Sequence, residues 1–221
     1  EDLMEKGLRK EVNAEFYCAV TRPPSVYRGN PFVIECAVAY GGQQPGDQSA
    51  SLLRFANRVP LLYQQGACAI TKCVQSTNWK PYGLQQSGSN MPVGPVTIVV
   101  HMASVWVPFS SEAKEAIAHY QEITKEIKLA LQEVGRKMQR YVHKKVRMHQ
   151  QLERASIFER YIPEVARSLA ELSGEKEAKI LQALEAMVKK EDIQREILQM
   201  ETLNSEFEGP EKEKGEGEEE E

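Results

Sequence analysis

Long hydrophobic runs are missing from this sequence of 221 residues. No stretch approaches the ~18 consecutive apolar residues that a membrane-spanning helix needs, and no signal peptide is visible. The sequence therefore offers no candidate for a membrane-spanning segment. Because the first residue is Glu rather than Met, we expect the chain to be a piece of a longer or processed polypeptide.

Metal-binding patterns are also missing. The cysteines show no CxxC or His-paired zinc spacing, and we expect them to be reduced and buried in an intracellular protein: Cys18, Cys36, Cys68 and Cys73. His119, His143 and His149 share no metal spacing either. His101 lies inside an apolar run and is predicted to be a core histidine with satisfied hydrogen bonds. We therefore predict no metal site in this chain.

The charge is unevenly distributed along the chain. The segment from Glu206 to Glu221 carries nine Glu and two Lys, so the net charge of −4 divides into −7 for this tail and +3 for the rest. A mildly basic body is compatible with a nucleic-acid partner but does not establish one. We predict that residues 204–221 form a disordered acidic tail.

The strongest local signal is the apolar, β-branched run from Val96 to Val107, which predicts a buried strand. Pro108 and Phe109 end this run. Ser111 is predicted to cap a helix that runs to about residue 154, because an apolar stripe at three- and four-residue steps follows it.

Lys114 stands out because it falls in the first turn of that predicted helix, where the helix dipole disfavours a cation. Two explanations remain open at this point. One is a solvated lysine on a surface helix, and the other is a cation that reaches past the strand end toward a phosphate. Position alone does not decide between them.

The rest of the chain divides into shorter elements. Strands are predicted at 16–21, 32–40 and 52–57, a loop at 22–31, a short helix at 67–74, a polar segment at 75–95 and further helices over 157–172 and 175–203. Strands come first and helices alone come later, which indicates an α/β sandwich that ends in a helical stalk. We place the boundaries at 1–13 (end of a linker helix), 14–155 (domain with the long helix), 156–203 (stalk helices) and 204–221 (tail).

Five motifs, in this order, closely resemble one family. They are Arg22–Phe32 (RPPSVYRGNPF), Arg54–Leu62 (RFANRVPLL), Trp79–Gly83 (WKPYG), Lys114–Ala118 (KEAIA) and Tyr161–Ala170 (YIPEVARSLA). The sequence is similar to the C-terminal transducer part of the B subunit of archaeal-type DNA topoisomerase VI, a type IIB topoisomerase. The resemblance covers roughly residues 7 to 200.

The resemblance implies an α+β two-layer sandwich of the ribosomal-protein-S5 domain 2-like fold, with a long C-terminal helical stalk. It also implies a role in a heterotetrameric enzyme, in which a GHKL-type ATPase dimerises on binding ATP. The transducer of that enzyme couples ATP binding and hydrolysis to double-strand DNA cleavage and passage by the A subunit, which relaxes supercoils and decatenates DNA. The implied partners are the A subunit, a second B subunit and double-stranded DNA, with no membrane, in the cytoplasm at the nucleoid.

The resemblance implies roles for particular residues too. Lys114 matches the transducer lysine that senses the ATP γ-phosphate, while Trp79, Lys80 and Tyr82 match a DNA-contact motif. ATP with Mg²⁺ is bound mainly by an ATPase domain whose Asp-x-Gly-x-Gly and Glu-x-x-x-Asn motifs this sequence lacks. The cleavage tyrosine and its metal belong to the A subunit, so we expect no catalytic residue in this chain alone.

Alternatives from other classes remain at this stage. A stand-alone nucleic-acid-binding module of the same fold is one, and a helical scaffold protein is another. Trp79 and Tyr82 are equally explained as packing residues beside a solvated Lys80. The basic run from Arg136 to Arg147 fits either a solvated helix face or a surface that DNA passes.

Overall fold

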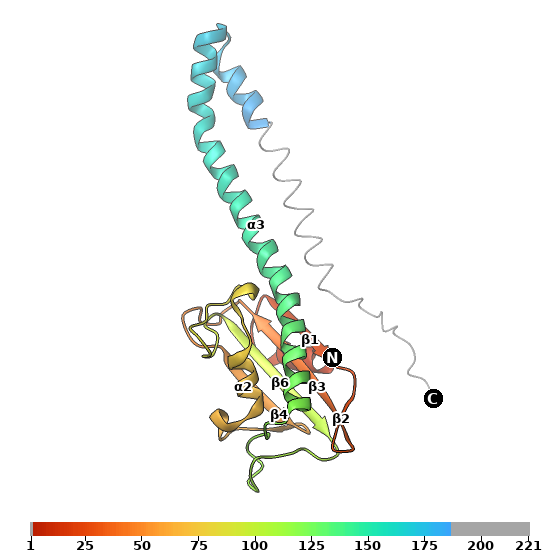
Figure 1. The fold of residues 1–221 in the computed structure, drawn as a ribbon. Coiled ribbons are helices and arrows are strands. Elements are labelled where there is room, and N and C mark those ends of the chain that lie inside the picture. The colour runs from red at the N-terminus through yellow and green to blue at the C-terminus, as the bar shows by residue number, and fades with distance from the viewer. Residues whose placement is uncertain (1, 187–221) are drawn as a thin grey trace, which may run out of the picture. The chain divides into compact units, whose positions relative to one another are not determined.

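A computed structural model describes residues 2–186 of the chain and divides it into two units, at Lys144 and Lys145. The first unit is built on one mixed sheet with the strand order β1-β3-β6-β4-β5, and β2 pairs with β3 (Figure 1). The strands are β1 (Phe16–Thr21), β2 (Ser25–Tyr27), β3 (Asn30–Tyr40), β4 (Ser51–Ala56), β5 (Val59–Pro60) and β6 (Val96–Ser104). Every pairing is antiparallel except that of β4 with β6.

Helices cover one face of this sheet. The helix α2 (Ala69–Ser76) and the first part of α3 (Gln121–Ser173) lie across it (Figure 1). The side chains of α3 that pack here repeat at three- and four-residue steps and are fully buried: Ile123, Ile127, Leu131, Val134 and Met138. This apolar stripe supplies most of the helical side of the core.

The opposite face is covered in part by α1 (Asp2–Glu11). Leu8 of α1 packs against Ala37, Ala39 and Val99 of the central strands. Successive residues of a strand point to opposite faces of the sheet. In β3, Cys36 and every second residue counted from it therefore face α3, while Ala37 and every second residue counted from it face α1. The predicted mixed α/β sandwich is confirmed, with this partial third layer added.

The central strand ends earlier than the sequence predicted, at Ser104 rather than Val107. The Ser104 hydroxyl donates a hydrogen bond to the Pro31 carbonyl and accepts one from the Trp106 amide, which bends the chain away from the sheet. Val105 and Trp106 are consequently 84% and 69% exposed.

The long helix begins at Gln121, so the prediction of a helix start after Ser111 is wrong. Between them the chain folds into a loop in which Phe109 pairs with Ile117. Ala116 and Ile117 were assigned to the helix because they fit its apolar stripe, but they are buried in this loop instead. The stripe of α3 itself starts with Ile123.

The helix α3 continues to Ser173 with Pro163 inside it, whereas the sequence predicted two separate helices there. An interior proline removes one backbone hydrogen bond and disfavours a helix, yet α3 does not end at Pro163. The predicted stop is confirmed, because Gly174 adopts a left-handed φ of 72° and its amide bonds to the Ala170 carbonyl.

In the second unit, Ile162 and Ala166 of α3 are buried, and residues 177–186 are helical. The remainder of the helix predicted for 175–203 and the predicted acidic tail at 204–221 lie outside the described residues.

Two predicted properties can be checked against the described part of the chain. All four cysteines are buried thiols that form no disulfide, and burial raises the pKa of the Cys73 thiol to about 11. Within the same residues, the helices that are long enough to cross a bilayer are too polar to do so.

Candidate functional site

The first candidate site is built on the loop between β6 and α3, whose base is held on both sides. The Ser110 amide donates to the Ala116 carbonyl and the Ala118 amide donates to the Pro108 carbonyl, both at 2.8 Å. The Ile117 carbonyl in turn accepts the amide of Ala69, the first residue of α2, at 2.9 Å. The loop therefore has a rigid base that is attached to α2, while its tip at residues 111–114 is exposed.

Lys114 lies at this tip, exposed, with a left-handed φ of 55°. Its amide closes a turn with the Ser111 carbonyl at 3.2 Å. Lys114 therefore does not lie in the first turn of α3, where the helix dipole would disfavour it, because the residue is seven positions before the helix. A left-handed lysine stores about 1–3 kcal/mol of backbone strain, of the kind that is concentrated in functional loops.

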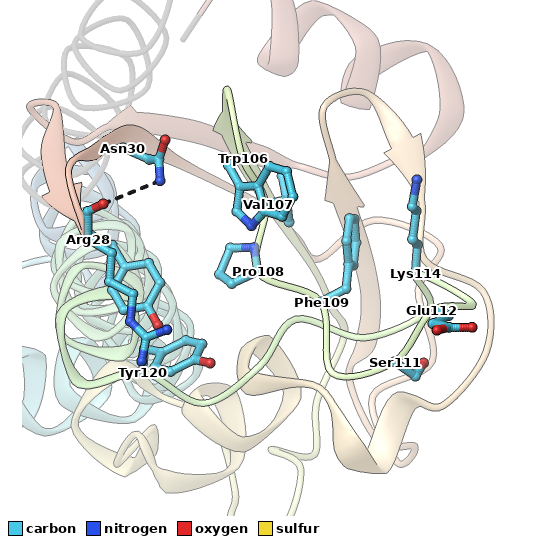
Figure 2. Close-up of a pocket in the computed structure, with 11 residues that line it drawn as sticks. Arg28, Asn30, Trp106, Val107, Pro108, Phe109, Ser111, Glu112, Lys114 and Tyr120 are labelled. Carbon is cyan, nitrogen blue, oxygen red and sulfur yellow. Dashed lines mark hydrogen bonds between the residues drawn. The ribbon is translucent and has the colours of Figure 1, made fainter.

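A pocket of about 360 Å³ opens between this loop and the turn that joins β2 to β3. In Figure 2, Arg28 and Tyr120 lie on one side of it and Lys114 on the other, with residues 106–109 between. The lining residues are Tyr27, Arg28, Asn30, Trp106, Val107, Pro108, Phe109, Ser111, Glu112, Lys114 and Tyr120. Two cations and one carboxylate give this lining a net positive charge, which suits an anion.

The Arg28 side of the pocket is held by aromatic rings. The Arg28 guanidinium carbon lies 5.4 Å from the ring centroids of both Tyr27 and Tyr120. Burial, with the neighbouring Tyr120 hydroxyl, raises the pKa of Tyr27 to about 12. Tyr27 is therefore a neutral wall of the pocket at physiological pH.

The second candidate site is the segment Trp79–Gly83, in which Trp79 is fully buried. Its indole Nε1 donates to the Val74 carbonyl at 2.8 Å, and its amide donates to the Gln86 side-chain oxygen at 3.0 Å. Tyr82 meets the indole edge to face, with centroids 5.8 Å apart. In this arrangement the Trp79 ring offers no surface to DNA and acts as the anchor of the segment.

Lys80 is the exposed charge of this segment. It begins the short 3₁₀ turn Lys80–Tyr82, and its amide donates to the Asn78 side-chain oxygen at 3.2 Å. The two residues that hold the turn in place are less exposed: Trp79 is buried and Tyr82 is partly buried. The geometry thus separates one solvated cation from two packing residues.

The basic run of α3 divides by the direction in which its side chains point. Lys137 donates to the Ala19 carbonyl at 2.9 Å and so faces the sheet. Arg136 and Arg140 are exposed. Two acidic residues of this helix pair with Arg22, which follows β1: Glu126 at 3.2 Å and Glu133 at 3.1 Å.

His101 is a satisfied histidine, as predicted, although it lies at the edge of the core. Its Nδ1 is 2.8 Å from a Glu35 carboxylate oxygen, and its Nε2 accepts the Arg58 amide at 3.1 Å. These partners assign the proton to Nδ1. Burial raises the pKa of Glu35, but the hydrogen bond with His101 outweighs it and holds that pKa below its ordinary value. Among residues 2–186, no three His, Cys, Asp or Glu side chains gather in a way that could hold a metal ion.

Sequence reasoning missed two parts of these sites. It did not connect Arg28 with Tyr120, which are far apart in the chain and meet only in the fold. It also passed over Gly135, where the ring of Tyr82 lies against the backbone of α3. A glycine in the middle of an amphipathic helix was the available signal.

Comparisons with known proteins agree on one family. The family model "Topoisomerase VI B subunit, transducer" matches residues 1–154. The B subunit of type 2 DNA topoisomerase 6 from Methanococcoides burtonii is 50% identical over 171 residues, which are 77% of this chain and 28% of that protein. The corresponding protein of Pyrococcus furiosus is 44% identical over 181 residues, 81% of this chain and 31% of that protein. The chain thus spans less than a third of the length of these relatives.

Among solved structures, the B subunit of DNA gyrase from Myxococcus xanthus is similar to this chain with a TM-score of 0.39 and 17% identity. The similarity covers 60% of this chain and 37% of that one. It is too low to support an argument about fold or function.

Proposed function

This chain belongs to the family of topoisomerase VI B-subunit transducers, and from that premise we propose that it couples ATP binding and hydrolysis to double-strand DNA cleavage and passage. ATP with Mg²⁺ is held by the ATPase part of the B subunit, and the A subunit cuts the DNA. A second B subunit and double-stranded DNA complete the assembly, which works in the cytoplasm at the nucleoid. The transducer itself carries no catalytic residue and acts by passing a conformational change from the ATPase part to the A subunit.

One observation carries this proposal: Lys114 is an exposed cation at the tip of a loop with a rigid base. A lysine in such a place can reach an anion outside its own domain, and phosphate is the anion that lysine commonly binds in nucleotide sites. The base of the loop bonds to α2 at Ala69, and Cys73 of α2 lies 3.7 Å from the Thr124 carbonyl of α3. Movement of Lys114 toward a γ-phosphate therefore has a short physical route to the long helix.

The experiment is Lys114→Ala in the full-length B subunit. We expect ATP turnover to fall about 100-fold, since one preorganised positive group at a transferring phosphate contributes on that scale. ATP affinity should change much less, because most contacts to the nucleotide come from the ATPase part. Lys6→Ala, an exposed lysine on α1, is the matched control, and wild-type turnover in Lys114→Ala would contradict the proposal.

For DNA, Lys80 is the contact residue of the Trp79–Gly83 segment, Trp79 its buried support and Tyr82 a partly exposed neighbour. Arg136 and Arg140 of α3 are exposed as well, and we propose them as further cations for DNA. A lysine of this kind binds the DNA backbone and contributes to affinity without reading sequence.

A further inference from the structure

Gly135 is the only glycine in α3, and it is buried. Glycine is less favourable than alanine in the middle of a helix, so its presence there calls for a contact that explains it. The contact is the ring of Tyr82. A Cβ at position 135 would lie 2.5 Å from Cε2, 2.6 Å from Cδ2 and 2.9 Å from Cζ of that ring.

A second contact of the same kind lies two helical turns further along α3. Gly83, with a left-handed φ of 89°, approaches Val142 so closely that a Cβ would be 2.8 Å from the valine Cγ1. Positions 135 and 142 are seven residues apart and therefore share one side of the helix. The segment Trp79–Gly83 is thus seated along α3 over two turns.

The other end of the segment is fixed to α2. The Trp79 indole bonds to the Val74 carbonyl in the last turn of that helix. Lys80 comes directly after this anchor and two residues before Tyr82, so its backbone is held from both sides.

We propose that Gly135 is a positioning residue for DNA binding: the bare helix backbone at this position leaves room for the Tyr82 ring, and the seated ring holds Lys80 where it contacts a phosphate. This inference rests on the DNA role of Lys80 given above. It adds a residue that touches no DNA and acts only through another side chain.

The test is Gly135→Ala in the full-length B subunit, measured by the salt dependence of its binding to a DNA duplex. The added methyl displaces Tyr82 and Lys80 with it, so one phosphate contact is lost. We expect the slope of log K against log salt to fall by about 0.9, and the affinity to fall about five- to ten-fold at 0.1 M salt. Gly7→Ala is the matched control, because Gly7 also lies in a helix but has no atom within 4 Å of its Cβ position.

A double-mutant cycle separates positioning from a general structural role. If Gly135 acts through Lys80, then Gly135→Ala has no further effect in a Lys80→Ala background. Tyr82→Leu removes the ring without adding atoms to α3, and it carries the same test if Gly135→Ala does not fold.

Two results would overturn the positioning role of Gly135. One is a wild-type salt slope in both Gly135→Ala and Tyr82→Leu while Lys80→Ala lowers it, in which case the DNA role of Lys80 stands and only the positioning role falls. The other is an equal loss from Gly135→Ala with and without Lys80. If Lys80→Ala itself binds like the wild type, the failure belongs to the proposed DNA contact.

Discussion

At the residue scale, the Trp79–Gly83 segment combines one exposed charge with two packing rings. Trp79 is fully buried, while Lys80 is exposed. A buried indole with its Nε1 bonded stabilises the fold, and an ammonium in solvent is free to meet a phosphate. Composition and order alone cannot make this division, because Trp-Lys-Pro-Tyr reads equally well as a packing or a binding segment.

Lys80→Ala should therefore weaken duplex binding without changing the fold. The affinity of the full-length B subunit should fall uniformly across DNA sequences, and the salt slope should fall by about one unit. The corresponding change at an exposed lysine of α1, Lys10→Ala, serves as control. Equal affinities for the wild type and Lys80→Ala at low salt would count against the contact.

Lys114 illustrates how far the sequence could be followed. The sequence predicted that Lys114 lies beyond the end of the central strand, but it did not predict the backbone conformation of this residue. The signals that placed it in a helix, Ser111 and the apolar pair Ala116 and Ile117, are used instead by a loop that packs on α2. That packing is a tertiary contact, and it overrides the local pattern.

At the scale of elements, the sheet was more predictable than its connections. β1 has the predicted bounds, 16–21, and the apolar runs of β3 and β6 are found as central strands. Continuous apolar runs are typical of strands buried on both faces. The start of α3 and its continuation through Pro163 were not predictable. Both depend on tertiary contacts of the helix, which the local sequence does not show.

The attachment of α3 to the sheet gives a prediction at this scale. Arg22 joins the sheet side to Glu126 and Glu133, and these side chains are between 15% and 35% exposed. Arg22→Ala leaves two carboxylates without this cation and should destabilise this part of α3 by about 1 kcal/mol. Hydrogen exchange of the α3 amides near Glu126 and Glu133 should then be about five-fold faster.

The control for that experiment is Arg9→Ala, which removes an i,i+4 pair with Glu5 on the surface of α1. Such pairs contribute about 0.3–0.5 kcal/mol, so little change is expected. If the α3 amides exchange as slowly in Arg22→Ala as in Arg9→Ala, the ion pairs do not hold the helix to the sheet.

At the scale of the whole molecule, family membership favours a transducer over the stand-alone module and the scaffold that the sequence also allowed. The two candidate sites lie in the first unit, which ends at Lys144 inside α3. The loop with Lys114 and the segment with Lys80 both contact α2, through Ala69 and Val74. The proposed nucleotide signal and the proposed DNA contact would thereby be linked to the same short helix.

The central claim is that Lys114 converts the presence of ATP into DNA cleavage, and the most direct measurement is cleavage by the full heterotetramer when a non-hydrolysable ATP analogue is added. For the wild type, double-strand cleavage should rise with the analogue. For Lys114→Ala it should stay at the level without nucleotide, although the analogue still binds. If Lys114→Ala responds to the bound analogue as the wild type does, the coupling does not pass through this lysine.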